Sequence, residues 1–398
     1  MTHTRRQIFS SSLVLLPALS QAQSQQAPSP QPKLRVGLML PYTGTFAQLG
    51  VAIENGFHLG LKELGGKIGG REVEFFKVDD ESDPAKAIEN ANKLVQRDKV
   101  DVLVGSVHSG VQLGIQKVAR ESGVLSIIPT AALHAATRSL CAPNVFRTSY
   151  TSYQQTYALG AALLAKGLKK VVWISWKYTA GEEMLEGFKE GFVQKNGIGG
   201  GVITKELWAP FPSVEFQALL TEIAALKPDA VACFFAGAGA AKFMKDYAAS
   251  GLKNKIPLYG AGTLTEGTLE AAGAAAEGVV TTMHYSDALD TPKNKAFRLA
   301  YAKMFKMQPD VYAVQGYDTA YLLSKGAVAV GGDFTKKAAL YKAMEAAVID
   351  SPRGKWKMSP SHNVVQDIYL RQVKNGENKV LGLAIKGLAD PGTGCKMG

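Results

Sequence analysis

Residues 101–120 read DVLVGSVHSGVQLGIQKVAR, which is a short apolar run, a turn rich in glycine and serine, and then a helical pattern. An apolar run of this length bounded by turn residues is typical of a buried strand. The same order recurs along the chain, for example after LRVGLML at 34–40 and after DAVACFFAG at 229–237. Repeated strand and helix units predict an α/β fold with parallel sheets and helices on both faces.

Helical stripes separate the strand-like runs. One helical face carries Ile53, Phe57, Leu61 and Leu64, and another carries Ile88, Ala91 and Val95, because both spacings fit a period of 3.6 residues. The remaining predicted strands are EVEFFKVDD (72–80), LSIIP (125–129), KVVWISW (170–176), VITKELW (202–208), PLYGA (257–261) and GVVTTMHY (278–285). The last part of the chain, 364–385, reads as a hairpin with Asn375-Gly376 at its turn.

The composition is that of a folded globular chain, with 398 residues, 46% hydrophobic, 20% charged and 3 cysteines. This length predicts two domains, each with its own core. No apolar run approaches the roughly 20 residues that span a bilayer, so we expect a mature protein that is not membrane-embedded. The net charge of +11 is spread thinly and forms no basic stripe, which argues against nucleic-acid binding.

The N-terminus has the layout of a secretory signal peptide over residues 1–22, with a positive start, an apolar stretch and a small-residue cleavage site near Ala22. Residues 23–33, rich in Gln, Ser and Pro, are predicted to be a disordered leader. Export across a membrane follows from this layout. Arg5-Arg6 leaves both the general and the twin-arginine route open.

Export permits disulfides, and the three cysteines differ in context. Cys233 lies in an apolar run and is interpreted as a buried thiol. Cys141 lies in the loop SLCAPN and Cys395 in the tail GTGCKMG. If these two pair, the bond closes a very long loop, worth roughly 4 to 5 kcal/mol by loop entropy. The sequence leaves open whether they are bonded or free.

Motifs of enzymes and of metal or nucleotide sites are missing from the chain. The six histidines show no HExxH spacing, the cysteines show no CxxC, and neither a GxSxG elbow nor a P-loop is present. A GxG at Gly237 lacks the third glycine of a dinucleotide fingerprint, where Lys242 stands, so we interpret it as a tight turn. We therefore expect a binding protein without cofactor or metal.

Ligands of open parallel sheets bind beyond the carboxyl ends of the strands. Two turns there carry hydroxyl groups: Ser109-Gly110, which open a helix, and Thr130-Ala131-Ala132. A helix start offers N–H donors and partial positive charge, which suit a carboxylate. The alternative is that Ser109 and Thr130 only cap helices.

Six segments, in this order and spacing, resemble the branched-chain amino-acid-binding family of periplasmic solute-binding proteins of ABC transporters. They are LPYTGTFAQLG (40–50), DDESDPAKAIENANKLV (79–95), VGSVHSG (104–110), IIPTAAL (127–133), NVFRTSY (144–150) and KPDAVACFFAG (227–237). The resemblance runs from Leu34 to the C-terminus. It implies the type I periplasmic binding protein fold, a Venus-flytrap clamp of two Rossmann-like lobes. The lobes are expected to close on a small molecule and to present it, as a monomer, to an inner-membrane permease.

Three chain crossings would form the hinge of such a clamp, and we expect them near 147–152, 284–287 and 351–356. The resulting lobes are 34–150 with 285–353 (lobe 1), and 151–284 with 354–398 (lobe 2).

The resemblance also assigns a site. Ser109 takes the place of the carboxylate-binding serine, but Ala132 stands where amino-acid binders carry a second hydroxyl, and Gly262 stands where they carry an acid for the ligand's ammonium. A buried ammonium without a partner costs several kcal/mol, so an amino acid is expected to be a poor ligand and an aromatic acid a better one. The predicted ligand-binding residues are Leu49, Ser109, Gly110, Thr130, Ala131, Ala132, Tyr150, Tyr178, Phe235, Gly237, Gly262 and Tyr312.

Three further segments resemble a benzoate-binding subgroup: HYSDALDTPKNKAFRLAYAKMF (284–305), YAVQGYDTAYLL (312–323) and DSPRGKWKMSPSHNVVQDIYLR (350–371). The expected ligand is therefore a benzoate-like carboxylate. Alternatives stay open. The chain is an amino-acid receptor if an acid such as Glu182, Glu183, Glu266 or Asp287 enters the cleft, and the same clamp also serves ligand sensors. An exported enzyme is the remaining alternative.

Overall fold

The computed structural model describes residues 1–4, 7, 31–193 and 200–397. The predicted signal peptide and leader, including Arg5, Arg6 and Ala22, lie almost wholly outside the described residues.

The first sheet is built from the N-terminal strands of the chain. Its strands are β1 (Leu34–Leu40), β2 (Lys67–Ile68), β3 (Arg71–Asp79), β4 (Val102–Val104), β5 (Leu125–Ile128) and β6 (Val145–Arg147). They lie in the order β2-β3-β1-β4-β5-β6. All neighbours are parallel except β2 and β3, because a tight turn joins those two strands and forces an antiparallel pair.

The second sheet follows in the chain and is mixed. Its strands are β7 (Lys170–Lys177), β8 (Val202–Pro210), β9 (Ala230–Phe234), β10 (Leu258–Ala261), β11 (Val280–Met283), β12 (Val348–Ser351), β13 (Gly354–Met358), β14 (Val364–Lys374) and β15 (Glu377–Leu388). The order is β12-β13-β14-β11-β10-β9-β7-β8, with β15 paired to β14. Strands β7 to β11 pair in parallel with one another, whereas the pairs β11–β14, β13–β14, β12–β13 and β14–β15 are antiparallel.

The predicted C-terminal hairpin is confirmed as β14 and β15. Its turn residues Asn375 and Gly376 both have positive φ, 54° and 72°, which is the backbone that an Asn-Gly hairpin turn requires.

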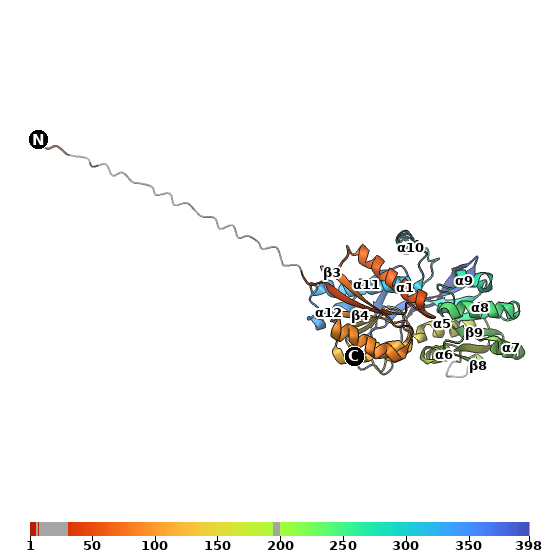
Figure 1. The fold of residues 1–398 in the computed structure, drawn as a ribbon. Coiled ribbons are helices and arrows are strands. Elements are labelled where there is room, and N and C mark those ends of the chain that lie inside the picture. The colour runs from red at the N-terminus through yellow and green to blue at the C-terminus, as the bar shows by residue number, and fades with distance from the viewer. Residues whose placement is uncertain (5–6, 8–30, 194–199, 398) are drawn as a thin grey trace. The chain divides into compact units, whose positions relative to one another are not determined.

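Helices connect the strands and cover the sheets (Figure 1). The α-helices are α1 (Ala47–Glu63), α2 (Ala87–Asn92), α3 (Ser109–Ser122), α4 (His134–Thr137), α5 (Ser152–Ala165), α6 (Thr179–Phe192), α7 (Gln217–Leu226), α8 (Gly237–Ala249), α9 (Leu269–Ala272), α10 (Pro292–Phe305), α11 (Val311–Ala329) and α12 (Lys337–Glu345). Short 3-10 turns span Pro84–Lys86, Leu252–Asn254, Gly262–Leu264 and Gly273–Ala276, and a π-helical turn spans Lys93–Arg97.

Helix α11 packs against α1, although the two are far apart in sequence (Figure 1). A Cβ atom on Gly56 would lie 1.9 Å from the carbonyl oxygen of Ala313, and one on Gly316 would lie 1.9 Å from that of Ile53. Only glycine permits this backbone approach. The chain therefore returns to the helices of the first sheet after it has built most of the second.

The helical stripes are confirmed in α1 and partly wrong in α2. Ile53, Phe57 and Leu61 are buried and Leu64, just after the end of α1, is half-buried, but Ile88 is 42% exposed. The buried stripe of this region contains Ala87 instead, because α3 packs so closely that a Cβ on Gly114 would lie 2.6 Å from the Ala87 Cβ. Only a small side chain fits on that face of α2.

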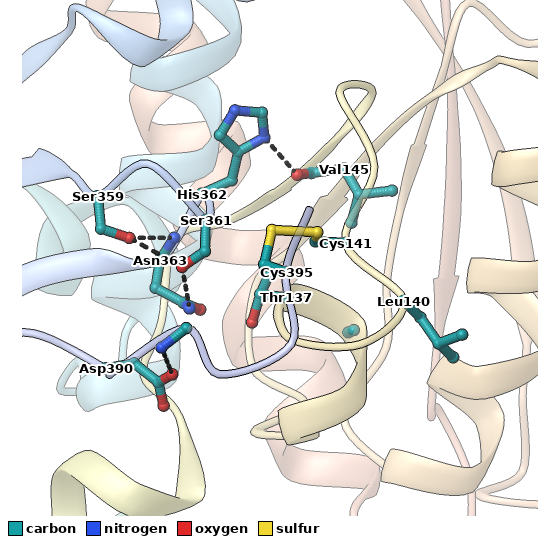
Figure 2. The surroundings of a disulfide bond; sticks show 12 residues. Thr137, Leu140, Cys141, Val145, Ser359, Ser361, His362, Asn363, Asp390 and Cys395 are labelled. Carbon is teal, nitrogen blue, oxygen red and sulfur yellow. Dashed lines mark hydrogen bonds between the residues drawn. A yellow bond between two sulfur atoms is a disulfide. The ribbon is translucent and has the colours of Figure 1, made fainter. Parts of the chain in front are cut away.

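The C-terminal tail is bonded to the first half of the chain. Cys141 and Cys395 form a disulfide with Cα atoms 5.5 Å apart, and Figure 2 shows the tail beside the loop that carries Cys141. Arg138 and Asp390 pair beside it at 2.9 Å. The third cysteine, Cys233, is a buried free thiol, as predicted. The bond and the ion pair together hold the segment after β15 to the loop after α4.

Candidate functional site

A narrow pocket of about 30 Å³ lies where the carboxyl ends of the strands of both sheets meet the following helices. This volume holds about one or two water molecules, so a larger ligand needs the walls of the pocket to move apart. Its walls are formed by Phe46, Leu49, Val107, Ser109, Thr130, Ala132, Tyr150, Tyr178, Ala180, Met184, Phe234, Ala236, Thr263 and Tyr312. Most of these residues follow a parallel strand within a few positions, which is where open α/β sheets bind their ligands.

The start of α3 forms one wall. His108 caps this helix, because its Nδ1 accepts hydrogen bonds from the N–H groups of Gly110 (3.1 Å) and Val111 (3.4 Å). Burial lowers the pKa of His108 to about 4, so the imidazole is neutral and able to accept. The alternative that Ser109 caps the helix is therefore wrong. Within the described chain, the buried Oγ of Ser109 has no hydrogen-bond partner, although Ser109 lines the cavity.

The turn after β5 forms the next part of the wall. Thr130 does not cap a helix, because its Oγ1 donates to Oε1 of Gln315 on α11 at 2.5 Å. Ala132 lines the cavity, whereas Ala131 does not, since its N–H donates to the carbonyl oxygen of Ser106 below the turn at 2.9 Å.

Three tyrosines line the cavity, of which Tyr150 and Tyr312 are buried and Tyr178 is partly buried. Burial raises the pKa of each hydroxyl above its usual value, so all three stay protonated and able to donate. Among the described residues, the Tyr312 hydroxyl finds no partner. Tyr178 stacks on His108 with ring centroids 5.0 Å apart. The cavity thus combines aromatic surface with two unpaired hydroxyl groups, those of Ser109 and Tyr312.

The structure brings seven of the twelve predicted residues together in the cavity wall. They are Leu49, Ser109, Thr130, Ala132, Tyr150, Tyr178 and Tyr312. Phe235 does not line it. Its ring packs in the core 4.5 Å from that of Phe243, and Phe234 takes its place in the wall. Neighbouring residues of a strand face opposite sides, and both sides of β9 are buried, so its sequence gives no polar alternation that would fix the register.

Three predicted glycines lie behind the wall and not in it. A Cβ on Gly110 would lie 2.7 Å from Cγ of Pro84, one on Gly237 would lie 2.4 Å from the carbonyl oxygen of Thr45, and one on Gly262 would lie 2.5 Å from Cβ of Met283. Each glycine is therefore required for close packing.

Sequence reasoning missed seven wall residues: Phe46, Val107, Ala180, Met184, Phe234, Ala236 and Thr263. Most carry no polar group, so nothing in the sequence separates them from ordinary core residues. For Ala180 and Met184 a signal exists, because they follow β7 closely, as Ser109 follows β4.

None of the four acids that would pair with a ligand cation is among the described wall residues. Glu183 accepts hydrogen bonds from the His134 N–H (2.9 Å) and the Ser152 hydroxyl (3.2 Å). Glu266 forms an ion pair with buried Arg371. Glu182 is exposed, and Asp287 accepts from Ser286 at 3.4 Å. In the part of the chain that the structure describes, no charged side chain lines the cavity.

The described residues also contain no group of three or more His, Cys, Asp or Glu side chains arranged to hold a metal ion. A helix long and apolar enough to cross a membrane is likewise missing from the described chain.

Comparison with known proteins matches residues 33–378 to the periplasmic binding protein family. The chain belongs to this family. Leu/Ile/Val-binding protein homolog 6 of Brucella melitensis biotype 1 is 30% identical to it over 356 residues, which are 87% of this chain and 88% of the relative.

Solved structures resemble this periplasmic binding protein closely. A solute-binding protein of an ABC transporter from R. palustris, in complex with benzoate, has a TM-score of 0.88 and 51% sequence identity over 92% of this chain and 99% of that chain. One from Rhodopseudomonas palustris BisB5, in complex with 3,4-dihydroxybenzoic acid, has a TM-score of 0.84 and 32% identity over 91% of this chain and 99% of that chain.

These comparisons confirm the predicted fold class, two α/β lobes of the type I periplasmic binding protein kind. The family and its relatives are solute-binding proteins and not enzymes. The cavity of this periplasmic binding protein is accordingly a candidate binding site, with no catalytic role.

Proposed function

We propose that this protein is the solute receptor of an ABC importer, and that it binds an aromatic carboxylate of the benzoate type in the cavity and delivers it to an inner-membrane permease. The observation that carries the proposal is the chemistry of the wall. Ser109 and Tyr312, whose hydroxyls are unpaired, line an aromatic and apolar cavity whose described lining holds no charged side chain.

A benzoate would find complementary groups on this wall. Its carboxylate would accept hydrogen bonds from the Ser109 and Tyr312 hydroxyls near the positive end of the α3 dipole. Its ring would pack among aromatic side chains such as Phe46, Tyr178 and Phe234. The complexes of the relatives with benzoate and 3,4-dihydroxybenzoic acid support this choice of ligand.

The competing ligand is a branched-chain amino acid, which the names of the Brucella relatives favour. Its ammonium would need a carboxylate, and the nearby acids are already held, Glu266 by Arg371 and Glu183 by His134 and Ser152. Burial of an unpaired ammonium costs several kcal/mol, which is enough to abolish useful affinity.

The proposal includes the cellular context. The protein would be exported to the periplasm, with its signal peptide cleaved near Ala22, and would act as a monomer. The lobes would be 34–150 with 285–353 and 151–284 with 354–398, and ligand would shift them from open to closed forms.

Titration calorimetry of the dialysed, ligand-free protein tests this function. We expect saturable binding of benzoate and no heat of binding with leucine. A thermal-shift series with the same compounds gives a second readout, because a ligand that binds only the folded state raises its melting temperature. Tight binding of leucine with no response to benzoate would overturn the proposal.

A further inference from the structure

The carboxylate of Glu183 joins elements that belong to different sheets. Glu183 lies on α6, next to the wall residue Met184, and α6 follows β7 of the second sheet. Its Oε1 accepts a hydrogen bond from the N–H of His134 at 2.9 Å, and His134 opens α4 between β5 and β6 of the first sheet. Its Oε2 accepts from the hydroxyl of Ser152 on α5 at 3.2 Å.

Further hydrogen bonds join α5 to His134 and to the turn that carries wall residue Ala132. The Nε2 of His134 accepts from the N–H of Tyr153 at 2.9 Å. The N–H of Ser152 donates to the carbonyl oxygen of Ala132 at 3.1 Å, and the single hydroxyl proton of Ser152 is shared between that oxygen, at 3.3 Å, and Oε2 of Glu183. We call Glu183, His134 and Ser152 the latch. It connects the Met184 wall of the cavity to the Ala132 wall.

We propose that Glu183 is a positioning residue for ligand binding, which holds these two walls together around the bound ligand. The inference rests on the proposed function only in that the cavity takes a ligand. A ligand enters this cavity when the walls from the two sheets separate, and that movement breaks the bond between Glu183 and His134. The latch therefore forms on closure and contributes directly to the closed state.

The latch does not require a charged carboxylate. Burial is the main reason that the pKa of Glu183 is raised from 4.5 to about 7, while its hydrogen bonds and Arg147 and Arg138 lower it in part. His134 is neutral, since burial lowers its pKa to about 3, and the hydroxyl of Tyr178 stays protonated. A neutral acid, or a glutamine, still accepts a hydrogen bond from the His134 N–H with its carbonyl oxygen.

The sign of the pH dependence follows from this shift. In the open form Glu183 is exposed to water and has an ordinary pKa, so closure raises its pKa and takes up a proton. The free energy that the Glu183 carboxyl contributes to closure is complete below its open-state pKa of 4.5 and is lost as pH rises through about 7. With 4.5 and about 7 for the two forms, the affinity should fall about tenfold between pH 6 and pH 8 through this group alone.

The experiment measures benzoate affinity by calorimetry at pH 6 and pH 8 for the wild type, Glu183→Gln, Glu183→Ala and the matched control Glu182→Gln. Glu183→Gln should bind at least as tightly as the wild type at pH 6, and its advantage should grow about tenfold at pH 8. Glu183→Ala leaves the His134 N–H unpaired, so this variant should bind about tenfold or more weakly than Glu183→Gln at both pH values. Glu182→Gln, on the exposed neighbour, should match the wild type throughout.

Comparison of Glu183→Gln with the wild type cancels the titration of His108 and His134, which both proteins share. Equal affinities of Glu183→Ala and Glu183→Gln, or an advantage of Glu183→Gln that does not change with pH, would overturn the proposal. Thermal melts show that each variant is folded before it is scored.

A second readout separates this inference from the proposed function. If benzoate fails to bind the wild type, the choice of ligand is wrong, and the latch is then judged on the ligand-free protein by small-angle X-ray scattering at pH 6. Glu183→Ala should have a larger radius of gyration than Glu183→Gln, because fewer molecules are closed. Identical scattering of these two variants would contradict the latch whatever the ligand is.

Discussion

Replacement of Tyr312 by phenylalanine removes one oxygen atom from the cavity wall and changes little else. Tyr312 is fully buried, and within the described chain its hydroxyl has no partner. An unpaired buried hydroxyl costs about 1 to 3 kcal/mol. The ligand-free variant should therefore be as stable as the wild type, or more stable by about 1 kcal/mol. Benzoate binding should lose a charge-assisted hydrogen bond of about 1.5 to 3 kcal/mol, which raises Kd roughly 10- to 150-fold.

Tyr247→Phe is the matched control. Tyr247 is equally buried, but its hydroxyl donates to the carbonyl oxygen of Ile256 at 2.9 Å, and it does not line the cavity. The same chemical change should here lower the free energy of unfolding by about 1 kcal/mol and leave the Kd for benzoate unchanged.

Urea unfolding of the ligand-free proteins and calorimetric titration with benzoate measure the two quantities. Tyr312→Phe should weaken benzoate binding without a loss of stability, whereas Tyr247→Phe should lose stability and bind benzoate as the wild type does. If Tyr312→Phe loses as much stability as Tyr247→Phe and binds benzoate like the wild type, the Tyr312 hydroxyl is a structural group, and the assignment of the carboxylate position is wrong.

Three further changes follow from the same structure. Ser109→Ala should raise the Kd for benzoate by about 10- to 150-fold in calorimetry, and an unchanged Kd would remove Ser109 from the site. Gly262→Ala places a methyl group 2.5 Å from Cβ of Met283 and should cost about 1 to 3 kcal/mol in urea unfolding, so a fully stable variant would contradict the packing argument. Replacement of both Cys141 and Cys395 by serine opens a loop of 254 residues and should cost up to about 5 kcal/mol in denaturant, whereas equal midpoints would show that the tail is held without the bond.

The alternation of strands and helices could be predicted because each apolar run is short, rich in β-branched residues and closed by a turn. The register of a strand with two buried faces could not. Phe234 and Phe235 are adjacent and equally apolar, and only the placement of β9 between two cores decides which of them reaches the cavity. The same uncertainty applies to Ile88 and Ala87 on α2. Gly114 of α3 approaches α2 so closely that the smaller residue, Ala87, is the one that is buried.

The positions of the polar wall residues could be predicted from the sequence, but most of their hydrogen bonds could not. Ser109 and Thr130 were found because hydroxyl residues follow predicted strands. The sequence could not show that His108 caps α3 and so leaves the Ser109 hydroxyl unpaired. Nor could it show that Glu183 is held by partners from an earlier part of the chain, since these hydrogen bonds span 49 and 31 positions.

An anion inside this cavity would meet only dipoles, because none of the fourteen described wall residues is ionic. The attraction of a dipole for an anion fades within a few ångströms, unlike the attraction of a lysine or arginine. Added salt screens charges beyond about 8 Å, so it should have little effect on the binding. The ligand would thus be bound strongly while the walls surround it, and the attraction would weaken steeply as soon as the walls move apart. Release of the ligand would then not require the separation of an ion pair between a wall cation and the ligand carboxylate. This suits a protein that has to release the ligand it binds.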